Sequence, residues 1–317
     1  MMEIKDRLIT DAFVIEAGHV GVLMGGNSAE REISLETGAH VISCLKESGV
    51  NATPIDWNGK LSLSENYMQY DRIFIATHGI GGEDGKIQSV LELLDIPYTG
   101  TKVLGCALAM DKIRAKLVWS GLDLSTPSFE VIDYDTDSAS LVKKIGLPLI
   151  VKPARGGSSF GITIVDDISQ LVEAISYAKK FDSLVIAESY ITGEEYTVSI
   201  LLDEALPAIK IKTPRAFYDF EAKYRSESTE YICPCELQPE AEEMIQEIAL
   251  EAFAALGGSG WGRIDFMKDE YGKFWLIEMN TVPGLTSHSL FPMSVHHSGK
   301  KITQAVLSIL SSSMTNE

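Results

Sequence analysis

The sequence predicts an α/β protein built from two or three domains. Its 317 residues exceed the size of one typical domain. In the first hundred residues, apolar runs typical of buried strands alternate with amphipathic stretches typical of helices. This alternation indicates a parallel sheet with helices on its faces. Hydrophobic residues make up 45% of the chain and charged residues 23%, which are the proportions of a folded globular protein.

The first predicted unit spans residues 1–100. The apolar run from His19 to Met24 predicts a strand, and the glycine pair after it predicts a tight turn. Ser28 is placed to cap the following helix, which reaches about Gly49. The residues before His19 carry no motif and are expected to be a leader. Further strands are expected at 52–56 and 71–76, and a further helix at 86–94.

The second predicted unit spans residues 101–187. Two helices come first, with Asp111 at their junction. A loop rich in glycine and serine, at 156–159, follows the first strand of this unit. Strands are expected at 148–152, 161–165 and 184–188, and a helix at 168–180.

The third predicted unit spans residues 188–317. Its polar stretch at 213–231 is longer than most loops in compact domains, and such loops often act as lids over active sites. Strands are expected at 194–202, 206–212, 262–267 and 273–280, a long helix at 240–256, and a helix at the end of the chain.

Composition excludes several classes of protein. The 27 basic and 45 acidic residues give a net charge of −18, which argues against a nucleic-acid-binding protein. An anionic small molecule remains possible as a ligand, because a few basic residues can dominate locally. No apolar run approaches the length of a membrane span, and the N-terminus has no signal-peptide pattern. The four cysteines show no zinc-site spacing, so we expect reduced thiols in a cytoplasmic protein.

Two polar faces are predicted on the strands near the carboxyl end of the chain. Side chains alternate along a strand, so Arg263 and Asp265 share one face, and Glu278 and Asn280 share another. If the strands pair, two carboxylates and an amide oxygen meet, and such ligands suit Mg²⁺ bound with substrate phosphates. Arg263 can then hold a carboxylate or a developing oxyanion. The alternative is an exposed sheet face with a surface ion pair.

Three widely spaced lysines, Lys112, Lys152 and Lys223, lie next to turns or helix starts. The glycines and serines after Lys152 allow backbone N–H groups to surround a phosphate. Neither a Walker loop nor a correctly spaced GxGxxG motif is present. A plain turn is the alternative interpretation of this loop.

The same loop matches the G-x-S-x-G pattern of α/β-hydrolases around Ser159, and Asp265 and His288 follow in the order of a catalytic triad. That pattern needs a helix directly after the serine, whereas β-branched residues follow here. A serine hydrolase is therefore the competing hypothesis of a different class.

Two further segments follow predicted strands, where open α/β sheets bind ligands. His78 begins a glycine-rich loop and is either a substrate contact or a structural histidine. Glu30 lies at the start of a helix, where it can complement the helix dipole or bind a substrate ammonium group.

Seven segments, taken together, point to one family: GGNSAEREISL, HGIGGEDGKIQS, MDKIRAK, VKPARGGSSFG, FYDFEAKY, GWGRIDFM and EMNTVPGLTSHSLFPM. In this order and spacing they resemble the bacterial D-alanine–D-alanine ligases of the ATP-grasp superfamily. The resemblance implies a three-lobed ATP-grasp fold with an N-terminal parallel α/β (preATP-grasp) lobe. It also implies the ATP-dependent joining of two D-alanines for peptidoglycan synthesis.

The resemblance also implies a role for each matching residue in nucleotide and metal binding. Lys112, Lys152 and Lys223 would contact the phosphates of ATP. Two Mg²⁺ ions, for which Mn²⁺ can substitute, would be held between the nucleotide and the protein. The adenine would lie against Glu188, Tyr190 and Ile191, the ribose against Glu195, and the metal ions against Asp265, Glu278 and Asn280.

For the amino-acid substrates, the resemblance assigns the ammonium group of the first D-alanine to Glu30, with His78 near the same substrate. Arg263 and the N–H of Gly284 would bind the oxyanion. The second D-alanine would contact Ser289 and Leu290, and Glu30, Tyr224 and Ser158 would form a hydrogen-bonded set that closes the lid.

Tyr224 favours an amine over a hydroxyl as the second nucleophile, because ligases that make D-alanyl-D-lactate typically carry a different lid there. A D-alanine–D-lactate-type ligase nevertheless stays an alternative, as does a nucleotide-binding module without turnover. Relatives are commonly dimers through the first lobe, so a homodimer is expected.

Overall fold

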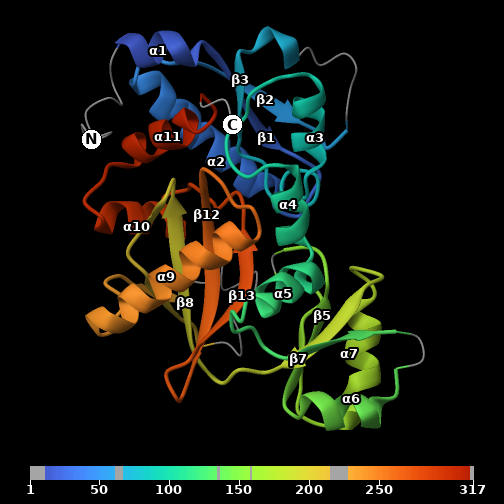
Figure 1. Cartoon of the computed structure of the whole chain (residues 1–317). Coiled ribbons are helices and arrows are strands. Elements are labelled where there is room, and N and C mark those ends of the chain that lie inside the picture. Colours follow the sequence, from blue (N-terminus) through green and yellow to red (C-terminus); the bar gives the residue numbers. More distant parts are fainter. Residues whose placement is uncertain (1–10, 61–66, 134–135, 158, 215–227, 315–317) are drawn as a thin grey trace.

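The structure is a computed structural model of the chain (Figure 1), and it describes residues 11–60, 67–133, 136–157, 159–214 and 228–314. Within these residues the strands form three sheets that follow one another along the sequence. Helices accompany each sheet, which confirms the prediction of an α/β protein. In this described part of the chain, no helix is both long enough and apolar enough to cross a membrane.

The first sheet is parallel, with β1 (His19–Gly25) between β2 (Asn51–Trp57) and β3 (Arg72–Ile75). Val20 and Val22 of β1 are fully buried, as expected for a central parallel strand with helices on both faces. The parallel arrangement predicted for this region is therefore confirmed. Its helices are α1 (Asp11–Ala17), α2 (Arg31–Glu47), η2 (Tyr67–Gln69) and α3 (Lys86–Leu93).

The second sheet is antiparallel, with the strand order β4-β7-β5-β6. Two helices precede it, as predicted, and the Asp111 side chain caps the second by accepting a hydrogen bond from the Arg114 N–H. Strand β4 and helix α6 were not predicted from the sequence. Each buries only one side chain, Ile132 in β4 and Leu141 in α6, so neither shows a long apolar period. The elements are α4 (Val103–Met110), α5 (Lys112–Gly121), β4 (Phe129–Ile132), α6 (Ser138–Ile145), β5 (Leu149–Pro153), β6 (Thr163–Val165), η3 (Ile168–Gln170), α7 (Leu171–Ala178) and β7 (Val185–Ser189).

The third sheet has the order β11-β10-β8-β12-β13, with β9 beside β8. The single strand expected at 206–212 is wrong: the chain forms β9 and β10 with a break at Pro207, which has no N–H to donate to a ladder. The polar stretch at 213–231 ends in a short strand, β11, that pairs with β10. The elements are β8 (Gly193–Leu201), β9 (Glu204–Ala205), β10 (Ile209–Lys212), β11 (Glu230–Ile232), α9 (Pro239–Ala255), β12 (Trp261–Asp269) and β13 (Phe274–Asn280).

The end of the chain returns to the first sheet. One terminal helix was expected, but the structure has two, α10 (Leu290–His297) and α11 (Ile302–Ser311). Helix α11 packs against α2 (Figure 1). Phe291 and Leu307 of these helices belong to the same buried apolar cluster as Val22 and Val41. The last helices therefore fix the third sheet to the first, so that the loops between them have defined positions.

Arg72 ties both ends of the described chain to this core. Its guanidinium donates to the carbonyls of Glu16 at 2.7 Å, Ala17 at 2.8 Å and Ser313 at 2.9 Å. Arg72 is buried. Helix α1, which lies among the residues expected to be a leader, is therefore held against the core, because Arg72 caps its C-terminal carbonyls.

Candidate active site

Two adjoining cavities contain the predicted site residues that the structure describes. The first has a volume of about 580 Å³ and the second about 700 Å³. They share six lining residues at their junction, namely Glu30, Gly79, Lys112, Gly156, Gly157 and Glu278.

The predicted residues divide between the two cavities, except that Glu30, Lys112 and Glu278 line both. The residues expected to bind amino acids line the first cavity: Glu30, His78, Arg263, Gly284, Ser289 and Leu290. The residues expected to bind the nucleotide line the second: Lys112, Lys152, Glu188, Tyr190, Ile191 and Glu195. Among the expected metal ligands, Asp265 lines the second cavity, Asn280 the first, and Glu278 both. Ser158, Lys223 and Tyr224 lie outside the described residues.

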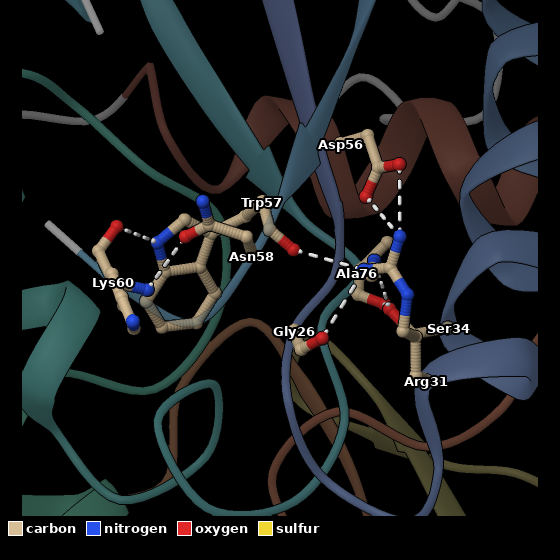
Figure 2. A network of polar contacts seen from close by, with 9 residues as sticks. Gly26, Arg31, Ser34, Asp56, Trp57, Asn58, Lys60 and Ala76 are labelled. Carbon is tan, nitrogen blue, oxygen red and sulfur yellow. Dashed lines mark hydrogen bonds and ion pairs between the residues drawn. The ribbon is translucent and has the colours of Figure 1, made fainter. Parts of the chain in front are cut away.

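The turn between β1 and α2 is held from several sides (Figure 2). The Ser34 hydroxyl accepts from the Gly25 N–H and donates to the Ala76 carbonyl, both at 2.8 Å. Arg31 donates to the Gly26 and Trp57 carbonyls, each at 3.1 Å, and forms a two-point ion pair with Asp56. The turn is therefore rigidly positioned where α2 begins. Beside it, the Trp57 indole donates to the Lys60 carbonyl, and the Lys60 N–H donates to Asn58.

Glu30 is the residue that this turn positions. It is the N-cap of α2, yet its side chain makes no capping hydrogen bond. A methyl group built on Gly79 would lie 2.9 Å from Glu30 Oε2, and one built on Gly157 would lie 3.4 Å from it. The carboxylate thus lies between two glycine loops at the junction of the cavities. The hydroxyl of Ser28, the residue expected to be the cap, accepts a hydrogen bond from the Glu30 N–H at 3.2 Å and donates one to the His78 carbonyl at 2.9 Å.

His78 is buried beside the first cavity. Its Nε2 lies 3.0 Å from Thr37 Oγ1, which also accepts the Leu285 N–H at 3.4 Å. Burial lowers the pKa of His78 below its ordinary value, so the imidazole is neutral at physiological pH. Thr37 therefore links the histidine to the loop that follows β13.

Glu83 is a site residue that the sequence interpretation missed. Its Oε2 accepts from the Gly79 N–H at 2.6 Å, and its Oε1 accepts from the Val282 N–H at 3.0 Å. The side chain thereby joins the loop after β3 to the loop after β13. Burial and the neighbouring Glu30 raise the pKa of Glu83 to about 8. Its position within the glycine-rich loop was the available signal, but its partner in a distant loop was not visible.

The raised pKa of Glu83 predicts a pH-dependent stability. Unfolded Glu83 loses its proton near pH 4.5, whereas the folded protein keeps it up to about pH 8. The folded state therefore binds more protons in this window, and rising pH favours unfolding. In urea titrations at pH 5 to 8, the free energy of unfolding should fall faster in the wild type than in Glu83→Gln. The slopes should differ by up to about 1.4 kcal/mol per pH unit. The control Glu251→Gln, at an exposed site, should show the wild-type dependence of the unfolding free energy on pH. If Glu83→Gln also showed the wild-type dependence, the raised pKa assigned to Glu83 would be contradicted.

The two carboxyl-terminal strands pair as the alternation predicts. Strand β12 is antiparallel to β13, with Arg263 opposite Asn280 and Asp265 opposite Glu278. Arg263 donates to both oxygens of Asp265 at 2.8 Å. The Asp265 side chain is only 9% exposed and that of Arg263 12%. The alternative of an exposed surface ion pair is therefore wrong, because these groups are enclosed at the cavities.

Further donors complete this cluster. The Thr197 hydroxyl donates to Asp265 at 2.6 Å, and the Asn280 amide donates to it at 3.0 Å. Lys112 Nζ donates to the Gly156 carbonyl at 2.9 Å and lies 3.3 Å from Glu278 Oε2. Lys112 thus connects the glycine-serine loop to the carboxylates.

The donor set fits a magnesium ion that is bound together with a nucleotide. Asp265, Glu278 and Asn280 offer carboxylate and amide oxygens, which are the ligands that Mg²⁺ prefers. Among the described residues, no three His, Cys, Asp or Glu side chains gather into a self-contained metal site. An ion at this junction would therefore complete its shell with phosphate oxygens and water.

A buried charge network lies at the back of the second cavity. Glu188, on β7, forms ion pairs with Lys152, on β5, and with Lys116, on α5, the latter at 2.9 Å. Burial raises the pKa of Glu188, but Lys116 and Lys152 outweigh burial and lower it to about 2. Glu188 is therefore an ionised carboxylate. Lys116 was missed by the sequence interpretation, although it ends the MDKIRAK segment.

The serine hydrolase hypothesis is not supported by the geometry. A strand, β6, follows the loop where a hydrolase needs a helix. His288 lines the first cavity, whereas Ser159 and Asp265 line the second. The Asp265 carboxylate is bound by Thr197 and Arg263. The three residues therefore do not form a catalytic triad.

Comparison with known sequences gives one consistent family. Residues 118–311 match the family profile described as "D-ala D-ala ligase C-terminus", and residues 58–101 match "D-ala D-ala ligase N-terminus". A D-alanine--D-alanine ligase of Nitrosococcus oceani is 52% identical over 94% of this chain and 94% of its own length. One of Alkalilimnicola ehrlichii is 50% identical over 95% of this chain and 96% of its own length.

Solved structures agree with the sequence comparison. D-alanine--D-alanine ligase of Bacillus anthracis superposes with a TM-score of 0.85 at 36% identity, covering 94% of this chain and 97% of that one. The same enzyme complexed with ATP gives a TM-score of 0.83 at 34% identity with the same coverage. The VanG D-Ala:D-Ser ligase of Enterococcus faecalis gives 0.83 at 30% identity, covering 94% of this chain and 99% of that one. The chain therefore belongs to the D-alanine–D-alanine ligase family and has its three-lobed ATP-grasp fold.

Proposed function

We propose that this protein joins two D-alanines to D-alanyl-D-alanine with ATP, through an acyl phosphate, for peptidoglycan synthesis. The observation that carries the proposal is the junction of the two cavities at one cluster of cations and carboxylates. One cavity offers the carboxylate, imidazole and guanidinium groups that recognise an amino acid. The other offers the lysines and the buried glutamate that suit a nucleotide.

The reaction at this junction begins with the carboxylate of the first D-alanine. Its oxygen attacks the γ-phosphorus of ATP, which gives an acyl phosphate and ADP. The deprotonated amine of the second D-alanine attacks the acyl carbon, and the tetrahedral intermediate then expels inorganic phosphate. The protein contributes mainly by positioning and by charge stabilisation, as is general for phosphoryl transfer.

The nucleotide-binding roles follow the lining of the second cavity. Lys112 and Lys152 hold the phosphates, and Lys223 joins them from the lid. Glu188 accepts a hydrogen bond from the adenine amino group, beside Tyr190 and Ile191, and Glu195 binds the ribose. Asp265, Glu278 and Asn280 would hold two Mg²⁺ ions, or Mn²⁺ in their place, and the ions would supply positive charge to the phosphates.

The substrate roles follow the lining of the first cavity. Glu30 binds the ammonium group of the first D-alanine, with neutral His78 beside it. Arg263 and the Gly284 N–H stabilise the oxyanion of the tetrahedral intermediate. Ser289 and Leu290 contact the second D-alanine, and Ser158 and Tyr224 close the lid with Glu30. Closure protects the acyl phosphate from water.

The organisation of the whole protein is part of the same proposal. The three lobes comprise residues 1–100, 101–187 and 188–317, with the lid at 213–231. The protein acts in the cytoplasm as a homodimer, without a nucleic-acid or membrane partner.

The test of this function is phosphate release from Mg·ATP with different second substrates, with the products identified by mass. We expect release with D-alanine alone, giving the dipeptide, and none with L-alanine. A D-lactate or D-serine adduct formed in preference to the dipeptide would change the assigned nucleophile. No release with any substrate would overturn the proposed function.

Glu30→Gln tests the ammonium site. The neutral amide keeps the size of the side chain but loses the charge that pairs with the substrate. We expect the KM for the first D-alanine to rise roughly ten-fold to a hundred-fold while the KM for ATP changes less than about two-fold. Glu36→Gln, which also lines the first cavity, is the matched control. If Glu30→Gln raised the KM for the first D-alanine and the KM for ATP by the same factor, the assignment of Glu30 to the substrate ammonium group would be wrong.

A further inference from the structure

Lys116 is a buried cation that the proposed reaction does not use. It lies on α5, and its side chain is 0% exposed. Its Nζ lies 2.9 Å from Glu188 Oε2 and donates to Thr126 Oγ1 at 2.6 Å. Burial lowers the pKa of Lys116 to about 8, against the opposing effect of Glu188. A buried cation of this kind is costly to retain unless its partners satisfy it.

Helix α5 is the element that brings this lysine to the nucleotide cavity. Ile113 of α5 packs with Ala154 and Ile186, next to the second sheet. Ala115 and Trp119 belong to the buried cluster beneath the third sheet. Helix α5 therefore lies between the two sheets that enclose the second cavity (Figure 1). Its position holds the Lys116 side chain in place from both sides.

The hydrogen bonds of Lys116 extend from one sheet to the other. The Thr126 hydroxyl accepts from Lys116 and donates to the Leu276 carbonyl at 2.8 Å. Leu276 lies on β13, two residues before the expected metal ligand Glu278. Glu188 lies on β7 of the second sheet. The chain from Leu276 to Glu188 thus fixes the carboxylate relative to the strand that carries the metal site.

We propose that Lys116 is a positioning residue for recognition of the nucleotide base. It acts through Glu188, which it keeps ionised and oriented, and this inference rests on the proposed function only for the assignment of adenine to Glu188. Each carboxylate oxygen can accept more than one hydrogen bond. Glu188 can therefore bind both lysines and still accept from a base, because it also lines the cavity.

The chemistry of this arrangement selects adenine over guanine. The exocyclic amino group of adenine donates to a carboxylate. Guanine presents a carbonyl oxygen at the corresponding position, which an ionised carboxylate repels. A carboxylate that loses one of its two counter-ions can shift toward the remaining lysine or take up a proton. A protonated Glu188 would donate to that carbonyl, so the preference for adenine depends on Lys116.

The experiment compares Lys116→Met with the wild type by calorimetric titration with Mg·ATP and with Mg·GTP, in the absence of D-alanine. Methionine keeps the length of the buried side chain but removes its charge and donors. We expect the Kd for ATP to rise roughly ten-fold or more. The Kd for GTP should change less than about three-fold. The preference for ATP, measured as the Kd for GTP divided by the Kd for ATP, should therefore decrease. In the dipeptide assay the KM for D-alanine should stay unchanged.

Three further variants separate this role from a structural one. Lys144→Met removes an exposed lysine that is ion-paired with Glu130 and should leave both Kd values unchanged. Thr126→Val keeps the lysine but removes its hydroxyl partner. It should decrease the preference for ATP over GTP as well, but by a smaller factor than Lys116→Met. Lys116→Met combined with Glu188→Gln should weaken ATP no more than Glu188→Gln alone, because Lys116 acts through that carboxylate.

The inference would be overturned if folded Lys116→Met kept the wild-type preference for ATP over GTP. If Lys116→Met does not fold, the same result in Thr126→Val would overturn it. The inference would also be overturned if Lys116→Met and Glu188→Gln weakened ATP binding additively when combined, because Lys116 would then act independently of Glu188. The binding measurement needs no turnover. If the wild type formed no dipeptide while Lys116→Met still decreased the preference for ATP, the proposed function would fail and the role of Lys116 would stand.

Discussion

Arg263→Ala is expected to lower kcat for dipeptide synthesis by about a hundred-fold to a thousand-fold, with the Kd for ATP changed less than about three-fold. Arg263 lines the amino-acid cavity, whereas the groups assigned to adenine and ribose line the other. The loss should therefore fall on the chemical steps, in which negative charge develops on the substrate. Steady-state kinetics and nucleotide titration measure the two effects separately.

The variant also removes the two hydrogen bonds that Arg263 makes to Asp265. Asp265 keeps the Thr197 hydroxyl and the Asn280 amide as donors, so we expect the protein to remain folded. Arg263→Lys is the matched variant, because it keeps the charge but loses the planar fork. It should recover only part of the activity, and added guanidinium should partly restore Arg263→Ala. Dipeptide formation at the wild-type rate by Arg263→Ala would rule out the oxyanion role.

Arg72→Met should lower the free energy of unfolding by about 3 kcal/mol or more. The substitution removes a buried guanidinium that donates to the carbonyls of Glu16, Ala17 and Ser313. Those carbonyls lie at the ends of helices near both ends of the chain, and methionine offers them no donor. Denaturant unfolding followed by circular dichroism measures the effect.

Arg114→Met is the control for Arg72. Its guanidinium pairs with Asp111 at 2.6 Å, but its side chain is 56% exposed. Water and salt weaken such a pair, so its loss should cost less than about 1 kcal/mol. Similar losses in the two variants would show that Arg72 does not hold the chain ends. Arg72→Lys should lie between them, because one ammonium group cannot satisfy all three carbonyls.

Part of the fold and of the site follows from local periodicity, and this part was predictable. The alternation of side chains along β12 and β13 places Arg263 with Asp265 and Glu278 with Asn280 whatever the rest of the protein does. The pairing in register, with Asp265 opposite Glu278, confirmed the cluster. The parallel first sheet followed likewise from the order of its apolar runs.

The missed residues have partners that are remote in the sequence. Lys116 follows Lys112 by one helical turn, and nothing local distinguishes a lysine that contacts solvent from one that pairs with Glu188. Glu83 depends in the same way on the Val282 N–H, and Arg72 on Ser313. Such contacts arise only when the sheets pack together, so periodicity cannot reveal them.

The most direct test of the central claim follows the oxygen atoms of the substrate. D-alanine with both carboxylate oxygens replaced by ¹⁸O is supplied with Mg·ATP, and the released phosphate is analysed by mass. Activation by phosphoryl transfer predicts one ¹⁸O atom in each phosphate, because the oxygen that bridges the acyl and phosphoryl groups leaves with phosphorus. Phosphate without ¹⁸O, released together with the dipeptide, would contradict the acyl phosphate and the ligase mechanism built on it.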